Sequence, residues 1–233
     1  MITLGIDLSS MPEDTATCRI RWEADRALAE PPQLGCTDEQ LDALIQTADA
    51  IGIDAPFGWP AEFAAAVNEW KSPVWNAEIR DSLRFRQTDL WIHDQFNLAP
   101  LSVSSDRIAL PAMRAMALLR RHGVHDRSGD GRFYEVYPAG SLKVGGMPNK
   151  GYKKPKDRHR RDAILKALRQ AMPWLIAPDD CAASADGLDA LVAALTARAA
   201  AQNLTHCPPS DQAEMARREG WIHLPSQFPS PGG

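Results

Sequence analysis

The clearest pattern along the chain is a short apolar run that ends on an acidic residue. Residues 51–54 read I-G-I-D, and Pro56 then removes the N–H donor that a longer strand needs. This predicts a buried strand with Asp54 at its carboxyl end. Residues 2–7, I-T-L-G-I-D, repeat the pattern and predict a first strand that ends on Asp7. Ligands of open α/β sheets bind at the carboxyl ends of strands, which makes both acids candidate site residues; capping of the next turn is the alternative for Asp54.

Between these two strands, the pattern predicts a hairpin and then a helix. Residues 15–23 alternate polar and apolar side chains over their second half, as a half-exposed antiparallel strand does, and 26–30 indicates a weak third strand. T-D-E-Q at 37–40 is a capping box, and apolar residues recur at helical spacing over 41–48. The predicted order is therefore strand, strand, weak strand, helix, strand.

Residues 56–111 do not follow the strand pattern and predict a mostly helical insertion, rich in tryptophan. Within it, R-F-R-Q-T-D at 84–89 places two arginines next to a threonine and an aspartate. Two interpretations stay open for Arg86. It either binds a phosphate of the substrate or forms a buried ion pair within the protein.

The second half of the chain predicts a helix over 110–121, a strand over 132–137, a helix that follows the basic run and has Ile164, Leu165 and Leu168 on its inner face, a helix over 184–201, a short edge strand or packed extension over 220–225 and a disordered tail over 226–233. Glu135 lies in the middle of its predicted strand. Asp186 and Asp189 are three residues apart on the last helix and therefore share a face. Stabilisation of the helix dipole is the alternative role for Asp186. Together the elements indicate an α/β fold, a mixed five-stranded sheet flanked by helices in a single domain.

Composition narrows the class of protein. The chain has 233 residues, 44% of them hydrophobic and 24% charged, which is typical of a globular domain. No apolar run approaches the roughly 20 residues that span a membrane, and no basic segment precedes an apolar one at the start, so we expect neither a membrane span nor a signal peptide. The four cysteines form no C-x-x-C motif, which favours a reduced, cytoplasmic protein without a zinc ribbon. These patterns make no prediction about oligomeric state.

The net charge of −4 conceals a basic segment at residues 150–161. This segment holds seven of the 26 Lys and Arg residues and one of the 30 acids, which leaves 19 basic and 29 acidic residues elsewhere. A solvated helix end is the ordinary explanation of such a run. Because the run follows flexible glycines in an otherwise acidic protein, contact with a nucleic-acid backbone is the favoured interpretation. The candidate substrate-binding residues are Arg86 and, in the basic segment, Lys150, Lys153, Lys154, Lys156 and Arg158.

The acids form a second candidate group, made of Asp7, Asp54, Asp189, Asp186 and Glu135. Carboxylates that converge at one sheet edge repel each other, and Mg²⁺ or Mn²⁺ relieves this repulsion because hard cations take oxygen ligands. Two such ions can clamp a phosphate and activate water, which is the two-metal route to phosphodiester cleavage. Asp7, Asp54 and Asp189 are the predicted metal ligands.

The order of these elements resembles that of the ribonuclease H-like superfamily, most closely its Holliday-junction-resolvase branch. The motifs G-I-D-L-S-S, I-G-I-D-A-P-F-G-W-P, F-R-Q-T-D, Y-E-V-Y-P-A, D-G-L-D-A-L-V-A-A-L-T-A and E-G-W-I-H-L-P, with the basic Y-K segment, resemble domain-of-unknown-function family 429, described as predicted ribonuclease H-like nucleases. The resemblance implies that Asp7, Asp54 and Asp189 form the acidic core, with Asp186 next to them. Glu135 matches the family's E-V-Y-P without an established role.

The sequence thus predicts a metal-dependent nuclease, with two alternatives. A binding or scaffold module that keeps the fold without catalysis is one of them. The other is a kinase, because G-I-D-L-S-S also resembles the first phosphate loop of sugar kinases of the actin-like superfamily. Those kinases need two such domains, and this chain has room for one.

Overall fold

The chain folds around one mixed sheet, and the computed structural model describes residues 1–70 and 75–232 of it. The strands are β1 (Ile2–Asp7), β2 (Ala16–Trp22), β3 (Ala27–Ala29), β4 (Gln33–Leu34), β5 (Ala50–Asp54), β6 (Phe133–Val136), β7 (Leu175–Ile176) and β8 (Ile222–His223). Their order is β7-β3-β2-β1-β5-β6-β8, and β4 pairs with β2 outside this path. β1 runs antiparallel to β2 and parallel to β5, which is in turn parallel to β6. The two strands that end on aspartates are therefore neighbours at the centre of the sheet.

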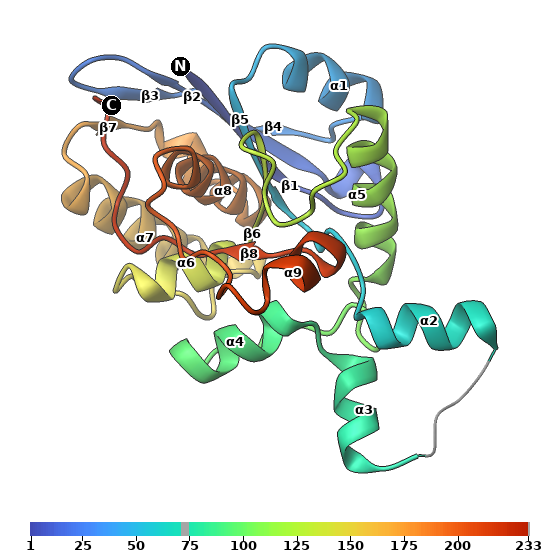
Figure 1. The fold of residues 1–233 in the computed structure, drawn as a ribbon. Coiled ribbons are helices and arrows are strands. Elements are labelled where there is room, and N and C mark those ends of the chain that lie inside the picture. The colour runs from blue at the N-terminus through green and yellow to red at the C-terminus, as the bar shows by residue number, and fades with distance from the viewer. Residues whose placement is uncertain (71–74, 233) are drawn as a thin grey trace.

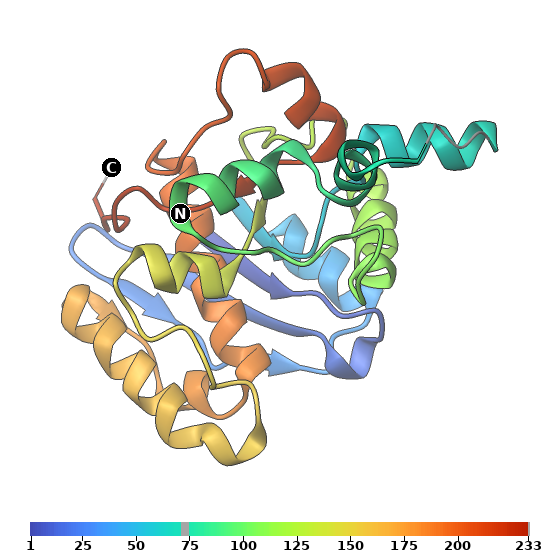
Figure 2. The ribbon, with the colours of Figure 1, turned by 90° about the horizontal axis from the view of Figure 1, so that it is seen from below.

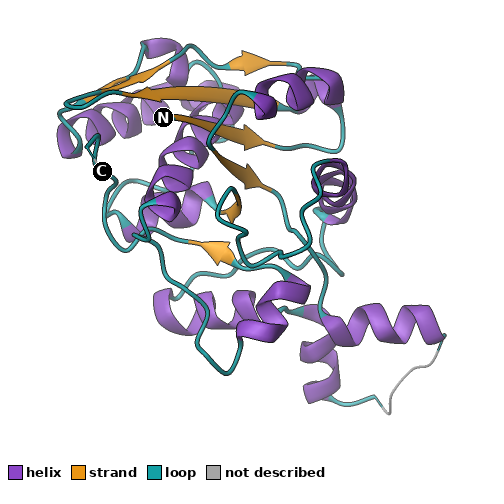
Figure 3. Ribbon diagram, turned by 45° about the horizontal axis from the view of Figure 1, so that its top comes forward, coloured by secondary structure: helices purple, strands orange, loops and turns teal. Residues whose placement is uncertain are grey.

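Helices cover both faces of the sheet (Figure 1). They are α1 (Asp38–Gln46), α2 (Ala61–Glu69), α3 (Ala77–Arg84), α4 (Gln87–Phe96), α5 (Ala109–Arg121), α6 (Pro138–Val144), α7 (Arg158–Ala171), α8 (Ala185–Ala201) and α9 (Ala213–Glu219). α1 and α5 pack on one face through a shared apolar core, and α6, α7 and α8 pack on the other. α2 and α3 project from this body (Figure 3).

Strand alternation divides the core into two layers. In β1, Leu4 and Ile6 join the core beneath α1 and α5, as do Ile51 and Ile53 of β5. Successive strand residues point to opposite faces, so the residues between them face α8. Those positions are held by small residues, which is why a helix fits so closely against them.

Gly5 and Gly52 are register partners on β1 and β5, and both lie directly under α8. A Cβ atom on Gly5 would stand 1.9 Å from the carbonyl oxygen of Ala190, and one on Gly52 would stand 2.4 Å from that of Ala193. Glycine is thus required by the close approach of two backbones rather than by a special φ. α8 crosses the strands at this point (Figure 2), and its side chains are buried along almost its whole length.

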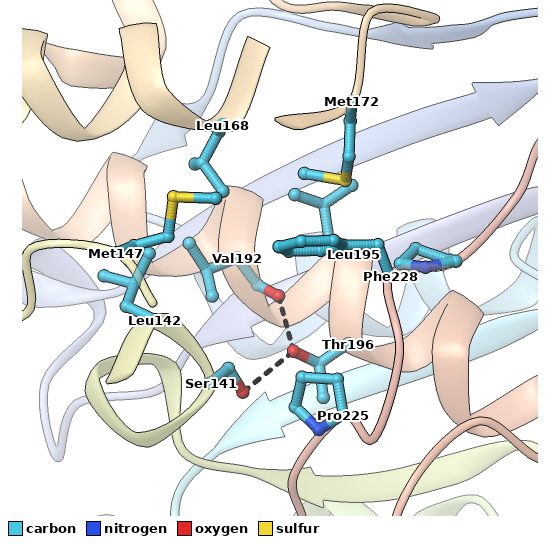
Figure 4. A pocket seen from close by; sticks show the side chains of 11 residues that line it. Ser141, Leu142, Met147, Leu168, Met172, Val192, Leu195, Thr196, Pro225 and Phe228 are labelled. Carbon is cyan, nitrogen blue, oxygen red and sulfur yellow. Dashed lines mark hydrogen bonds between the residues drawn. The ribbon is translucent and has the colours of Figure 1, made fainter. Parts of the chain in front are cut away.

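A small apolar pocket of about 30 Å³ lies between α8, α7 and the C-terminal segment (Figure 4). The Thr196 hydroxyl marks its polar end, with Oγ1 2.9 Å from the Val192 carbonyl oxygen and 3.1 Å from Ser141 Oγ. Phe228 lines the same pocket, and the Ser230 N–H further along donates a hydrogen bond to Gln202, the residue just after α8. The disorder expected over 226–233 stays a prediction, and residue 233 lies outside the described residues.

The sheet is larger than the five strands predicted from the sequence. The strands that the sequence did not predict, β4 and β7, are two residues long, which is too short for an alternation of polar and apolar residues to be recognised. The weak strand expected at 26–30 is present as β3, and the edge strand expected at 220–225 is β8. Residues 56–111 contain α2, α3 and α4. Among the described residues, no helix has the length and apolar character required to cross a membrane.

Candidate functional site

Asp7 and Asp54 lie side by side at the carboxyl ends of two parallel strands. They are register partners on β1 and β5, and neighbouring strands are about 4.8 Å apart. Asp7 continues the alternation of Gly5, and Asp54 continues that of Gly52, so both carboxylates lie on the face covered by α8. Each side chain is half-buried, and no donor in the described part of the chain hydrogen-bonds to either carboxylate. Two carboxylates without donors are thus held close together on rigid strand ends.

Asp189 is the third acid of this site, and it comes from α8. The helix begins after Ser184, whose hydroxyl accepts a hydrogen bond of 2.9 Å from the Gly187 N–H. Asp189 follows one turn later and is completely buried. Its Oδ1 accepts a 2.7 Å hydrogen bond from the Tyr152 hydroxyl, and its Oδ2 accepts one from the Lys153 ammonium. Both oxygens of Asp189 therefore already have partners within the protein.

The charges of these acids oppose one another. Burial raises the pKa of Asp7 well above its usual range, and the neighbouring charges of Asp54 and Asp189 raise it further. Burial is also the main reason why the pKa of Asp54 rises to about 7, against the lowering effect of Lys153. The pKa of Asp189 is raised by burial, opposed by Lys153 and Tyr152. The site therefore favours a bound cation or proton, which would relieve the repulsion.

The acids open into a cleft of about 550 Å³. Asp186, half-buried in the first turn of α8, lines this cleft together with Asp7, Asp54 and Lys153, and burial raises its pKa. Much of the remaining wall is apolar and comes from the segment after α4 and the start of α5, with Pro100, Leu101, Ile108 and Pro111. The cleft is thus acidic at its floor and apolar along one side, a size and character typical of a site for a small molecule or one nucleotide unit.

Glu135 lies at the same edge of the sheet but faces the opposite side. It is the register partner of Ile53, whose side chain points toward α1 and α5, whereas Asp54 points toward α8. Glu135 Oε2 accepts a hydrogen bond of 2.8 Å from the Phe57 N–H, and both oxygens bind Arg86. Glu135 therefore lines the wall of the cleft, and its charge helps to raise the pKa of Asp54, but its side chain lies on the other face of the sheet from Asp7 and Asp54.

Arg86 forms a buried ion pair within the protein, the second of the two interpretations that the sequence left open. Only 1% of this residue is exposed, and its guanidinium binds Asp89, Glu135 and the carbonyl oxygen of Glu219. Its charge is thus neutralised inside the protein. Arg86 touches the wall of the cleft but has a structural ion pair in place of the predicted substrate phosphate.

The basic segment separates into two parts. Lys153 reaches into the acidic site, whereas Lys150, Lys154 and Lys156 are exposed outside it. Arg158 pairs across one helical turn with Asp162 at 3.6 Å. The structure thus brings one of the five predicted basic residues of this segment to the acids. The other four remain exposed on the surface.

Two residues of the site have no distinct signal in the sequence. In the sequence, Tyr152 is one residue of the glycine-rich loop, and Arg161 is one more charge of the basic segment. In the structure, Tyr152 binds Asp189. In the structure Arg161 is only 3% exposed, and its guanidinium binds four backbone carbonyl groups at 2.9–3.1 Å. A Tyr-Lys pair five residues before the start of a basic helix is too short a pattern to predict burial.

The chemical character of the site suits a divalent cation, but the protein does not supply a complete set of ligands for one. In residues 1–70 and 75–232, no group of three or more His, Cys, Asp or Glu side chains has the arrangement of a metal site. Asp7 and Asp54 nevertheless offer oxygen donors without protein partners, and Mg²⁺ commonly binds through one or two carboxylates, with water and substrate phosphate as further ligands. Asp7 and Asp54 are therefore the residues that would hold such an ion, and Asp189 would have to release Lys153 to join them.

The fold and the site define an α/β protein with an acidic cleft at the carboxyl ends of its central parallel strands. Residues 5–214 match the family model described as protein of unknown function, DUF429, and the chain belongs to that family. No curated protein and no solved structure matches the chain.

Proposed function

We propose that this protein is a metal-dependent nuclease that hydrolyses phosphodiester bonds in the acidic cleft. The observation that carries the proposal is the pairing of Asp7 and Asp54 at adjacent strand ends, where neither carboxylate accepts a hydrogen bond from the described part of the chain. Such a pair is unfavourable without a cation and is well placed to hold Mg²⁺ or Mn²⁺. The exposed lysines beside the cleft supply positive charge for a nucleic-acid backbone.

The chain order of the elements supports a ribonuclease H-like fold for this nuclease. An acid-ended strand, an antiparallel hairpin, a helix, a second acid-ended strand and a late helix with D-x-x-D follow one another, as in that superfamily. The sheet pairs the two acid-ended strands at its centre. Fold alone does not carry the activity, which rests on the acids.

The proposed reaction adds water across a P–O bond. A bond forms between the water oxygen and phosphorus, the bond to the leaving oxygen breaks, and the leaving oxygen takes up a proton. A bound divalent ion lowers the pKa of water and neutralises phosphate charge. Asp7 and Asp54 would hold the ion, and the half-buried carboxylate of Asp186, which lines the same cleft, would accept the proton that the water loses. The apolar wall from Pro100 to Pro111 excludes bulk water on one side.

Replacing Asp7 by Asn tests the proposal, since Asn keeps the shape and removes a ligand charge. Wild-type protein is incubated with single-stranded, duplex, hybrid and branched nucleic acids in Mg²⁺, in Mn²⁺ and in EDTA, next to Asp7→Asn. Asp211→Asn, an exposed acid away from the cleft, is the matched control. We expect cleavage that requires the metal, is lost in Asp7→Asn and is kept in Asp211→Asn. Cleavage that survives Asp7→Asn would place the chemistry elsewhere, and binding without cleavage would favour the scaffold alternative.

A further inference from the structure

Of the two lysines at 153–154, Lys153 reaches the acids, and it lines the cleft together with Asp7 and Asp54. Its ammonium binds Oδ2 of Asp189. A lysine is protonated at neutral pH and this one is partly exposed, so it places a cation directly on the Asp189 carboxylate. The three acids thus share one permanent positive charge supplied by the protein itself.

The backbone on both sides of Lys153 is clamped in place. Arg161 Nη1 donates hydrogen bonds of 2.9 Å to the carbonyl oxygens of Tyr152 and Lys154. The same guanidinium donates through Nε to the Ala182 carbonyl oxygen at 3.0 Å and through Nη2 to that of Ala183 at 3.1 Å. Arg161 therefore fixes the loop that carries Lys153 to the segment just before α8, the helix that carries Asp189.

Tyr152 fixes the same loop from the other side. Its ring is 1% exposed within the core under α7 and α8, and its hydroxyl holds the second oxygen of Asp189. The chain approaches Tyr152 through Gly151, whose φ of +71° favours glycine. A lysine in a solvated charge run needs none of these constraints. The surrounding contacts therefore fix the side chain of Lys153 at the acids, whereas the side chain of Lys154 is exposed outside the acidic site.

We propose that Lys153 takes the place of the second metal ion, so that the site works with one divalent ion at Asp7 and Asp54 and one ammonium group at Asp189. This inference rests on the proposed nuclease function and replaces its two-metal form. One divalent ion and one ammonium neutralise the three carboxylates completely. The substrate phosphate would then lie between a metal ion and a lysine, which gives positive charge at both the attacking and the leaving oxygen.

The test counts bound metal ions. Isothermal titration calorimetry with Mn²⁺ alone, and no substrate, is carried out on wild-type protein, Lys153→Met and Lys154→Met. Methionine keeps the length of the side chain and removes its charge, and Lys154 is the matched control one residue away. We expect one ion in wild type and in Lys154→Met, and two ions in Lys153→Met, with the first bound about tenfold tighter because a neighbouring positive charge is gone. Cleavage by Lys153→Met should fall at low Mn²⁺ and recover at high Mn²⁺.

The outcomes separate this inference from the function on which it rests. Two ions in wild-type protein, or a single ion in Lys153→Met, would overturn the lysine inference and leave metal-dependent cleavage intact. No ion in either protein, together with no cleavage, would overturn the proposed function itself. Circular dichroism of Lys153→Met without metal shows whether the variant is folded. If it is not, Lys153→Gln replaces it in the same titration with the same expected result.

Discussion

Arg86 and Glu135 form a two-pronged ion pair in the interior, with Nη1 2.9 Å from Oε2 and Nη2 2.8 Å from Oε1. Asp89 binds the same guanidinium through Nη2 at 3.0 Å. The pair joins the start of α4 to the central sheet, and both residues line the wall of the cleft. It fixes the helical insertion to the strand next to Asp54, which connects the stability of the insertion to the shape of the cleft.

Replacing Arg86 by Met should destabilise the protein by about 3–5 kcal/mol, because two buried carboxylates lose their partner. Urea unfolding measures the change in the free energy of unfolding. Adding Glu135→Gln should restore part of the loss, since one of the unpaired charges is removed. Arg158→Met, which breaks a surface pair, should cost less than about 1 kcal/mol. Equal losses in the free energy of unfolding for Arg86→Met and Arg158→Met would show that the buried pair stabilises the protein no more than the surface pair.

Replacing Gly5 by Ala should separate α8 from the sheet. The new Cβ would meet the Ala190 carbonyl oxygen at 1.9 Å and the Ala194 nitrogen at 2.4 Å, and both are backbone atoms that cannot turn away. We expect a loss of about 3 kcal/mol in the free energy of unfolding, because α8 has to move away from the sheet to admit the new methyl group. Gly232→Ala, with its nearest contact at 3.4 Å, should leave the free energy of unfolding unchanged. An unaltered melting temperature in Gly5→Ala would contradict this close packing.

The stability of the metal-free protein should depend on pH because of Asp54. Its pKa is about 7 in the folded protein against an ordinary 3.8, so between these values the folded state holds a proton that the unfolded state has released. The contribution of this group to stability therefore decreases as pH rises from 4 to 7. In EDTA, we expect the melting temperature of Asp54→Asn minus that of wild type to increase as the pH rises from 4 to 7. A difference between the two proteins that is constant with pH would show that Asp54 titrates normally.

The exposed lysines should govern the salt dependence of nucleic-acid binding. Lys150, Lys154 and Lys156 lie outside the acidic site and are accessible to a phosphate backbone. Changing all three to Gln should weaken binding and reduce the slope of log K against log salt by roughly one unit per lost contact. Fluorescence anisotropy at several salt concentrations measures this slope, and Lys166→Gln on α7 is the control. A slope that stays the same would show that these lysines are only solvated.

Much of this arrangement follows from local patterns in the sequence. The alternation of β1 and the apolar run of β5, each ending on an aspartate, are properties of a few adjacent residues, as is the capping box at Thr37 that starts α1. Because parallel strands end at the same edge, the meeting of Asp7 and Asp54 follows once β1 and β5 are recognised.

Tertiary structure decided which charges share a site. Glu135 belongs to a strand as clear as the others, but strand pairing sets its register with Ile53 and turns it to the face away from Asp54. Lys153 and Lys154 are identical in the sequence, and only the hydrogen bonds of Arg161 and Tyr152 direct one of them to Asp189. Tyr152 and Asp189 are 37 residues apart, and Arg161 also binds carbonyl groups 21 and 22 residues away, so the geometry depends on packing that no local pattern encodes. The sequence by itself therefore determined the acids at the strand ends, whereas the fold determined the cation that accompanies them.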